Sequence, residues 1–280
     1  MNVLFPATVE AALEALCAEP DAHVMAGGTD LLVRCRAEQN RPETLVCLEK
    51  VADLAGFEIS DGRIRIGAAT SMTAVLENAA VRERLPLLHG AAKVFASPLV
   101  RNMATLGGNV CTASPAADML PPLYALGAEV ELRSLSGVRT MPVNDFIVGP
   151  GQMALAPGEL LSAIIIPIPE GRTIQYFEKV GRRKALAISV VSLAALLRVE
   201  DGVIAEARLA WGSVGPMVIR CPEAEALLKG RSLTLGALRE AGEKVRDTVS
   251  PISDVRASAE YRRQVAANLL LRLAQISGAH

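Results

Sequence analysis

Aromatic residues are scarce in this sequence, and it carries almost no excess of charge of either sign. Phenylalanine, tyrosine and tryptophan make up 3% of its 280 residues, so a stacking surface for nucleic-acid bases is not expected. Lysine and arginine number 29 against 30 acidic residues, which gives a net charge of -1. Nucleic-acid binders carry a basic excess, so we expect no nucleic-acid partner.

Histidine and closely spaced cysteine are also scarce. The three histidines, His23, His89 and His280, supply little for metal or catalytic-triad chemistry. The odd number of cysteines and the lack of any CxxC spacing disfavour a disulfide framework, a thiolate metal cage and an iron–sulfur cluster. The five are Cys17, Cys35, Cys47, Cys111 and Cys221. We expect reduced thiols and a cytoplasmic protein.

Long hydrophobic runs are absent as well. The two longest mostly apolar stretches are residues 188–197 and 160–168, and Pro167 interrupts the second. A membrane-spanning helix needs about 20 apolar residues, so no membrane span is expected. The N-terminal sequence MNVLFPATVEAALEAL lacks the basic start and continuous apolar core of a signal peptide.

The common nucleotide and hydrolase fingerprints are not found. The sequence has no GxGxxG, GxxxxGK[ST], HExxH or GxSxG. Gly149-Pro150-Gly151 comes nearest to the first, but Pro157 follows it and it opens no helix. Neither a Rossmann site nor a P-loop is therefore supported.

The residues that are present predict a folded protein with two or three lobes. Hydrophobic residues make up 51% of the chain and charged residues 21%. Spacing and turn signals predict helices at 9–19, 30–36, 71–80, 87–95, 123–126, 235–249 and 257–276. They predict strands at 23–26, 44–48, 63–66, 130–133, 160–166, 175–180, 187–199 and 203–211, with an Asp201-Gly202 hairpin turn. Residues 97–122, rich in Gly, Pro, Ser, Thr and Asn, are predicted to be a long functional loop.

A first candidate site is Ala26-Gly27-Gly28-Thr29-Asp30, placed between a predicted strand and a predicted helix. Two glycines there allow backbone N–H groups to approach an anion closely. The alternative is a tight turn in which Thr29 or Asp30 caps the helix.

A second candidate site is Ala104-Thr105-Leu106-Gly107-Gly108-Asn109, which continues through Thr112, Ser114, Pro115 and Asp118. Hydroxyl and amide groups can donate to phosphate oxygens, whereas the Asp118 carboxylate would accept hydrogen bonds from ligand hydroxyl or ring N–H groups. The alternative is a surface loop in which Asp118 caps the next helix. Two glycine-pair loops in one chain favour a two-point cradle for a diphosphate ligand.

Two further features depend on what the loops bind. Cys111 lies in the second loop but has no nearby histidine, so we interpret it as a packing residue. Residues 177–184, FEKVGRRK, are a solvated basic turn unless they reach an anionic or electron-rich ligand.

Together, AGGTDLL, FASPLVRNMATLGGNVCTASPAADMLPPL and FEKVGRRKALAIS resemble the FAD-binding medium subunit of the molybdenum hydroxylases. This is the family of xanthine dehydrogenase and aerobic carbon monoxide dehydrogenase. The resemblance covers essentially the whole chain, and the TLGGN…TASPAAD stretch is its most specific part. No cysteine cluster marks the benzoyl-thioester reductase branch, which carries an extra [4Fe–4S] cluster.

The resemblance implies an α+β fold in three parts. Two small α/β subdomains, residues 1–55 and 56–170, would cradle FAD, and residues 171–280 would form a C-terminal antiparallel sheet with helices. The implied cofactor-binding residues are Ala26, Gly27, Gly28, Thr29, Asp30, Leu31, Phe95, Ala96, Thr105, Gly107, Gly108, Asn109, Thr112, Ser114, Asp118 and Lys179. Gly27 to Asp30 would wrap the pyrophosphate, and Asp118 would contact the ribityl chain or the ring edge. Lys179 would approach the flavin face, and one of Arg182 and Arg183 would support its loop.

The resemblance also implies a function within a complex. Substrate would be oxidised at a molybdopterin centre on a large subunit, and electrons would pass through [2Fe–2S] clusters on a small subunit to FAD on this chain. The acceptor would be NAD, oxygen or another molecule. Two alternatives are a self-contained FAD-dependent oxidase and a flavin-free assembly factor of the same fold.

Overall fold

The computed structural model describes residues 1–37, 41–171 and 173–276 as two compact units. Unit 1 comprises Met1–Glu77, Ser97–Ala113 and Gly127–Pro167. Unit 2 comprises Asn78–Ala96, Ser114–Leu126 and the described residues from Ile168 onward. His280 lies outside the described residues.

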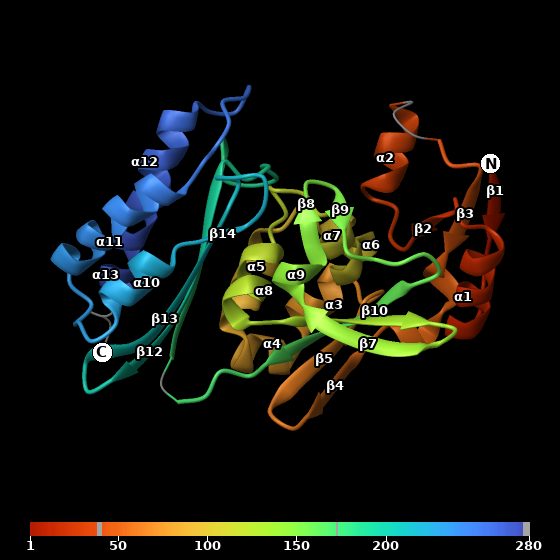
Figure 1. Cartoon of the computed structure of the whole chain (residues 1–280), viewed down its shortest axis with the longest axis horizontal. Coiled ribbons are helices and arrows are strands. Elements are labelled where there is room, and N and C mark those ends of the chain that lie inside the picture. The colour runs from red at the N-terminus through yellow and green to blue at the C-terminus, as the bar shows by residue number, and fades with distance from the viewer. Residues whose placement is uncertain (38–40, 172, 277–280) are drawn as a thin grey trace. The chain divides into compact units, whose positions relative to one another are not determined.

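Unit 1 begins with a small parallel sheet of order β1-β3-β2. Its strands are β1 (Asn2–Leu4), β2 (His23–Met25) and β3 (Thr44–Cys47). Helix α1 (Val9–Ala18) starts as predicted, because the Thr8 side chain accepts a hydrogen bond from the Ala11 backbone N–H at 3.1 Å. The apolar face of α1 is buried with Val46 and Leu48. Helix α2 (Leu31–Arg36) follows the first glycine pair (Figure 1).

A second sheet of unit 1 is antiparallel throughout and has the order β4-β5-β10-β6-β7. Its strands are β4 (Phe57–Ser60), β5 (Arg63–Gly67), β6 (Glu129–Ser134), β7 (Gly137–Pro142) and β10 (Leu160–Pro167). The remaining elements of unit 1 are α3 (Met72–Glu77), α6 (Pro98–Met103), α7 (Leu106–Cys111), α9 (Val143–Phe146), β8 (Ile147–Gly149), β9 (Gln152–Met153) and the 3-10 turns at Leu48–Lys50 and Ala52–Leu54.

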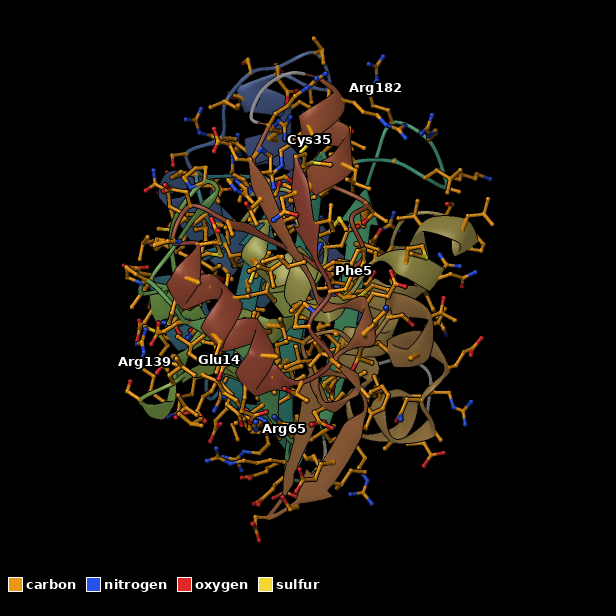
Figure 2. All side chains as sticks on the ribbon, turned by 90° about the vertical axis from the view of Figure 1, so that its right-hand side faces the viewer. Phe5, Glu14, Cys35, Arg65, Arg139 and Arg182 are labelled. Carbon is orange, nitrogen blue, oxygen red and sulfur yellow. The ribbon has the colours of Figure 1, made fainter. Side chains whose placement is uncertain are left out.

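Charged side chains cross one face of this second sheet. Arg65 on β5 donates to both carboxylate oxygens of Glu131 on β6, at 3.1 and 2.7 Å. Arg133 and the Ser162 hydroxyl also donate to Glu131, at 3.2 and 2.6 Å. Figure 2 labels Arg65 on β5 and Arg139 on β7 among the side chains of this unit. The network ties β5, β6 and β10 together by their side chains as well as by their backbones.

Unit 2 is a four-stranded antiparallel sheet with helices on both faces. Its strands are β11 (Thr173–Val180), β12 (Val191–Glu200), β13 (Val203–Gly212) and β14 (Ile219–Arg220), in that order. Its helices are α4 (Ala79–Arg84), α5 (Pro86–Val94), α8 (Leu120–Leu126), α10 (Pro222–Leu228), α11 (Leu235–Thr248), α12 (Ala259–Leu269), the 3-10 turn Leu270–Arg272 and α13 (Leu273–Ile276). Helices α5 and α8 cover one face and α10 to α13 the other (Figure 1).

The core of unit 2 follows the two-residue period of its strands. Leu193, Ala195 and Leu197 on β12 are buried against the C-terminal helices. Trp211 on β13 is fully buried, and its indole N–H donates to the Ala266 carbonyl at 3.0 Å. The predicted Asp201-Gly202 turn joins β12 to β13.

The structure corrects four of the predicted elements. Residues 97–122 are not one long loop, because they contain α6, α7 and the start of α8. Ser97 and Thr105 cap these short helices through their hydroxyls, at 3.2 Å to Val100 N and 3.0 Å to Gly108 N. The predicted helix 71–80 is two helices, because Asn78 caps α4. A 3-10 turn at 270–272 interrupts the last helix, and the strand predicted at 187–199 begins at Val191.

The α+β class and the C-terminal antiparallel sheet with helices are confirmed. The first and third predicted segments each contain one sheet, and the second contains the five-stranded sheet and the two-stranded β8-β9 sheet. Residues 78–96 and 114–126 group with the C-terminal sheet in unit 2. The three-part division stays a prediction. No helix of the described residues is long and apolar enough to cross a membrane.

Candidate functional site

The two glycines of the first loop are needed for different reasons. A side-chain carbon on Gly27 would lie 1.8 Å from the Met103 carbonyl oxygen at the end of α6, so only glycine fits this contact between two segments of unit 1. Gly28 has a φ of 68°, in the left-handed region that favours glycine. Met103 could not be found from the sequence, because nothing in its spacing marks the contact.

The first loop offers a row of backbone donors. In the described part of the chain, none of the backbone N–H groups of residues 27–31 has a hydrogen-bond acceptor. Asp30 occupies the N-cap position of α2, but its side chain makes no capping hydrogen bond among the described residues. Asp30 instead pairs with Arg34 at 2.9 Å and accepts from the Thr112 hydroxyl at 3.3 Å. This last contact brings the two glycine loops together in unit 1.

The backbone donors of the second loop are already used within the protein. The N–H groups of Leu106 and Gly107 donate to the carbonyls of Thr70 and Ala68, at 3.0 and 2.9 Å. The N–H groups of Gly108 and Asn109 donate to the hydroxyl and carbonyl oxygens of Thr105, both at 3.0 Å. These donors cannot also bind an anion unless α7 opens. Uncommitted backbone donors are therefore seen only in the first loop, and the two-point cradle for a diphosphate ligand stays a prediction.

The second glycine pair also divides into two roles. A side-chain carbon on Gly107 would lie 2.6 Å from the Ala68 side chain, so this glycine allows close packing of α7. Gly108 is exposed, and a side-chain carbon there would meet only the Thr105 hydroxyl, at 2.8 Å. The bare face of Gly108 is thus the part of this loop that is open to a ligand.

In unit 2, Asp118 and Lys179 form a buried ion pair. The Lys179 Nζ lies 2.6 Å from the Asp118 Oδ2, and their side chains are 7% and 8% exposed. Lys179 also donates to the Val94 carbonyl at 3.4 Å, at the end of α5 and next to Phe95 and Ala96. Ala96 has a φ of 39°, a strained value for a residue other than glycine.

The second carboxylate oxygen of Asp118 is left without a partner. Its Oδ1 is buried and makes no hydrogen bond to any of the residues that the structure describes. The alternative in which Asp118 caps the next helix is therefore not realised. Burial raises the pKa of Asp118, and the charge and hydrogen bond of Lys179 oppose that shift. A buried, unpaired acceptor of this kind is the mark of a missing hydrogen-bond donor.

Neighbouring residues of the motifs serve structural roles. Arg183 donates to the carbonyls of Ala185 and Leu186, at 3.0 and 3.1 Å, within the loop after β11. Arg182 donates instead to the Val255 carbonyl at 3.0 Å. Burial raises the pKa of the Cys111 thiol to about 12, which makes it a poor nucleophile and agrees with its interpretation as a packing residue.

The structure thus places the candidate residues in two groups. Unit 1 holds Ala26, Gly27, Gly28, Thr29, Asp30, Leu31, Thr105, Gly107, Gly108, Asn109 and Thr112. Unit 2 holds Phe95, Ala96, Ser114, Asp118 and Lys179. The Lys179 ammonium group contacts Asp118 and the carbonyl of Val94, the residue before Phe95 and Ala96. The Ser114 hydroxyl accepts from the Ala116 N–H at 3.2 Å.

Comparison with known proteins identifies the family. Residues 1–169 match the model of the FAD binding domain in molybdopterin dehydrogenase, and residues 175–276 match that of the CO dehydrogenase flavoprotein C-terminal domain. The chain belongs to the FAD-binding subunits of the molybdenum hydroxylases. It is therefore an oxidoreductase subunit, and FAD is its cofactor.

Individual relatives are similar along nearly their whole length. The xanthine dehydrogenase FAD-binding subunit of Escherichia coli O157:H7 is 37% identical over 258 residues, which cover 91% of this chain and 88% of the relative. The carbon monoxide dehydrogenase medium chain of Afipia carboxidovorans is 32% identical over 252 residues, covering 90% and 87%. The crystal structure of quinoline 2-oxidoreductase from Pseudomonas putida 86 superposes with a TM-score of 0.94 at 29% identity, covering 100% of this chain and 98% of that one.

Proposed function

We propose that this FAD-binding subunit transfers electrons within a multi-subunit molybdenum hydroxylase. It would receive them from [2Fe–2S] clusters on a small partner subunit and deliver them to an external acceptor. The observation that carries the proposal is the buried Asp118 Oδ1, which has no hydrogen-bond donor among the described residues and lies on a carboxylate paired with Lys179. It is found in a chain that belongs to an FAD-binding family. A flavin offers N–H and hydroxyl donors of the kind this oxygen lacks.

The first loop of unit 1 supplies donors for the pyrophosphate of FAD. The N–H groups of residues 27–31 are uncommitted within the described chain, and consecutive N–H groups of this kind bind phosphate oxygens well. The bare face of Gly108 admits the ligand where a side chain would fill space. In unit 1 Thr112 keeps the two loops together through Asp30, and Thr105 fixes α7.

In unit 2 the side chains suit the flavin end of the cofactor. Lys179 holds the Asp118 carboxylate in place, so that Oδ1 can accept a hydrogen bond from the ribityl chain or the ring. Phe95 and Ala96 follow Val94, whose carbonyl accepts a hydrogen bond from Lys179, and Ser114 lies four residues before Asp118 in the sequence. When bound, FAD supplies one- and two-electron redox chemistry, and the protein supplies binding, orientation and electrostatics.

The names of the relatives support a complex. They are described as subunits and medium chains, and the molybdopterin centre would lie on a large partner subunit. The cysteines of this chain lack the spacing of a cluster site, which supports [2Fe–2S] clusters on another chain. NAD is one candidate acceptor, and reduced thiols support a cytoplasmic location. The substrate stays open among purines, nicotinate, aldehydes and carbon monoxide.

Purification of the full chain with FAD tests the proposal. We expect a yellow protein that shows no hydroxylase turnover with xanthine or nicotinate until the other two subunits are added. Robust turnover by the lone chain would favour the self-contained oxidase. A chain that stays colourless alone and in the complex would favour the flavin-free assembly factor.

A further inference from the structure

Arg262 is a buried arginine that connects three segments of unit 2. It lies on α12 and is 3% exposed. Its Nη1 atom donates to the carbonyls of Val190 and Ser213, at 2.8 and 3.1 Å, and its Nη2 donates to the Asp254 Oδ1 at 2.7 Å. Its Nε is buried and makes no hydrogen bond among the described residues, so the Nη1 and Nη2 contacts are the ones that hold the guanidinium in place.

The Val190 contact leads to Lys179. The backbone N–H of Val190 donates to the Val180 carbonyl at 2.8 Å, and Val180 is the residue after Lys179 at the end of β11. The Val180–Val190 hydrogen bond closes the 181–189 loop beside Lys179. Arg262 binds the Val190 end of this closure.

The Ser213 contact leads to Asp118. The backbone N–H of Ser213 donates to the Pro115 carbonyl at 2.9 Å, three residues before Asp118. Ser213 has a φ of 64°, a conformation that a residue other than glycine adopts only when its surroundings hold it there. The Arg262 hydrogen bond to its carbonyl is one such constraint.

The third partner of Arg262 is itself fixed. The Asp254 carboxylate accepts from the backbone N–H groups of Arg256 and Ala257, at 2.8 and 3.2 Å, and from the Arg256 guanidinium at 2.8 Å. Asp254 therefore gives Arg262 a rigid anchor in the loop between α11 and α12.

We infer that Arg262 is a positioning residue that sets the Asp118–Lys179 pair. It is tied through Val190 and Val180 to the backbone beside Lys179, and through Ser213 and Pro115 to the segment that carries Asp118. Neither member of the pair touches Arg262 in the contacts above, so its effect passes through backbone hydrogen bonds. The inference rests on the proposed function for its consequence in FAD binding, but the arrangement of the pair can be tested without FAD.

The test compares four variants of the full chain. Arg262→Met removes all three contacts, and Arg262→Lys keeps the charge but cannot reproduce the guanidinium fork. Arg256→Met removes the other arginine bound to Asp254 and leaves the Val190 and Ser213 contacts in place. Val245→Ala leaves a small cavity in the hydrophobic core of unit 2, so it controls for destabilisation that does not involve Arg262.

The first measurement is the rate at which Lys179 reacts with an amine-specific acylating reagent, read by mass spectrometry. In Arg262→Met we expect the rate at Lys179 to rise roughly tenfold, the effect of one lost charged hydrogen bond, with a smaller rise in Arg262→Lys. Arg256→Met and Val245→Ala should leave the rate close to that of the parent. Unchanged labelling in Arg262→Met, or equal rises in all four variants, would overturn the inference.

The second measurement is FAD affinity together with the visible spectrum of the bound flavin, at a temperature where every variant is folded. Arg262→Met should bind FAD roughly tenfold more weakly than Val245→Ala. A parent chain that binds no FAD in its complex would refute the proposed function while leaving the labelling result valid. Parent-like FAD affinity and spectrum in an Arg262→Met protein whose Lys179 is exposed would show that the pair does not serve the flavin.

Discussion

Replacing Lys179 with methionine should destabilise unit 2 in a manner that depends on pH. The variant keeps most of the side-chain volume but leaves the Asp118 carboxylate buried, with neither oxygen paired. Removing one partner of a buried ion pair typically costs about 3–5 kcal/mol, because the remaining charge is uncompensated. We expect a loss of this size in the free energy of unfolding at neutral pH.

The sign of the pH dependence follows from the pKa of Asp118. Burial already raises that pKa, and Lys179 is the group that lowers it, so the pKa should rise further in the variant. A protonated Asp118 carries no charge, and the loss should be small below the unfolded-state pKa of about 3.9. It should grow as pH rises toward the raised folded pKa, with a slope of up to about 1.4 kcal/mol per pH unit, and then level off.

Urea unfolding at several pH values provides the assay. Trp211 is the single tryptophan of the chain and is fully buried in the same unit, so its fluorescence reports the unfolding of this unit. The double variant Lys179→Met/Asp118→Asn should regain part of the lost free energy of unfolding. Its stability should also depend little on pH, because no buried charge remains. If Lys179→Met lowered the free energy of unfolding by less than about 1 kcal/mol, or by the same amount at pH 5 and pH 8, the Asp118–Lys179 pair would not be buried and desolvated as described.

Three further predictions concern unit 1. Gly108→Val should give a folded, colourless protein, because the new side chain meets only the Thr105 hydroxyl within the protein but fills space open to the cofactor; normal flavin content would contradict this role. Gly27→Ala should instead lower the unfolding temperature markedly, since its side-chain carbon would overlap the Met103 carbonyl, and a parent-like melting curve would refute that contact. The pKa of Glu131 is lowered to about 2: burial would raise it, but hydrogen bonds from Arg65 and Ser162 and the arginine charges outweigh burial. Its stabilisation, about 2 kcal/mol after allowance for solvent screening, should be present above pH 4.5 and disappear as pH falls toward 2, and Glu131→Gln should show a flatter acid-unfolding profile.

Local signals in the sequence were enough to predict much of the fold. Thr8 and the 3.6-residue spacing after it predicted α1, and Asp201-Gly202 predicted the hairpin between β12 and β13. The segment 97–122 could not be predicted in this way, because glycine and proline in α6 and α7 read as loop residues. Their helices depend on hydroxyl caps and on tertiary packing, such as Gly107 against Ala68.

The candidate site shows the same limit. The motifs directed attention to both glycine pairs, and the spacing alone could not separate a glycine that a ligand approaches from one that packs inside the protein. Gly27 and Gly107 are close contacts within the protein, and such contacts join residues far apart in the chain, which spacing cannot reveal. The Asp118–Lys179 contact likewise joins residues 61 positions apart. Arg262 has no motif around it, and only the fold connects it, through backbone hydrogen bonds, to the segments that carry this pair.

The electron-transfer role is tested most directly by single-turnover reduction of the flavin without oxygen. The full chain, loaded with FAD, is mixed with the hydroxylase substrate first alone and then together with the molybdopterin and [2Fe–2S] subunits. We predict that the flavin absorption band stays unchanged in the lone chain and bleaches only when both partner subunits are present. Bleaching by substrate in the lone chain would contradict the account.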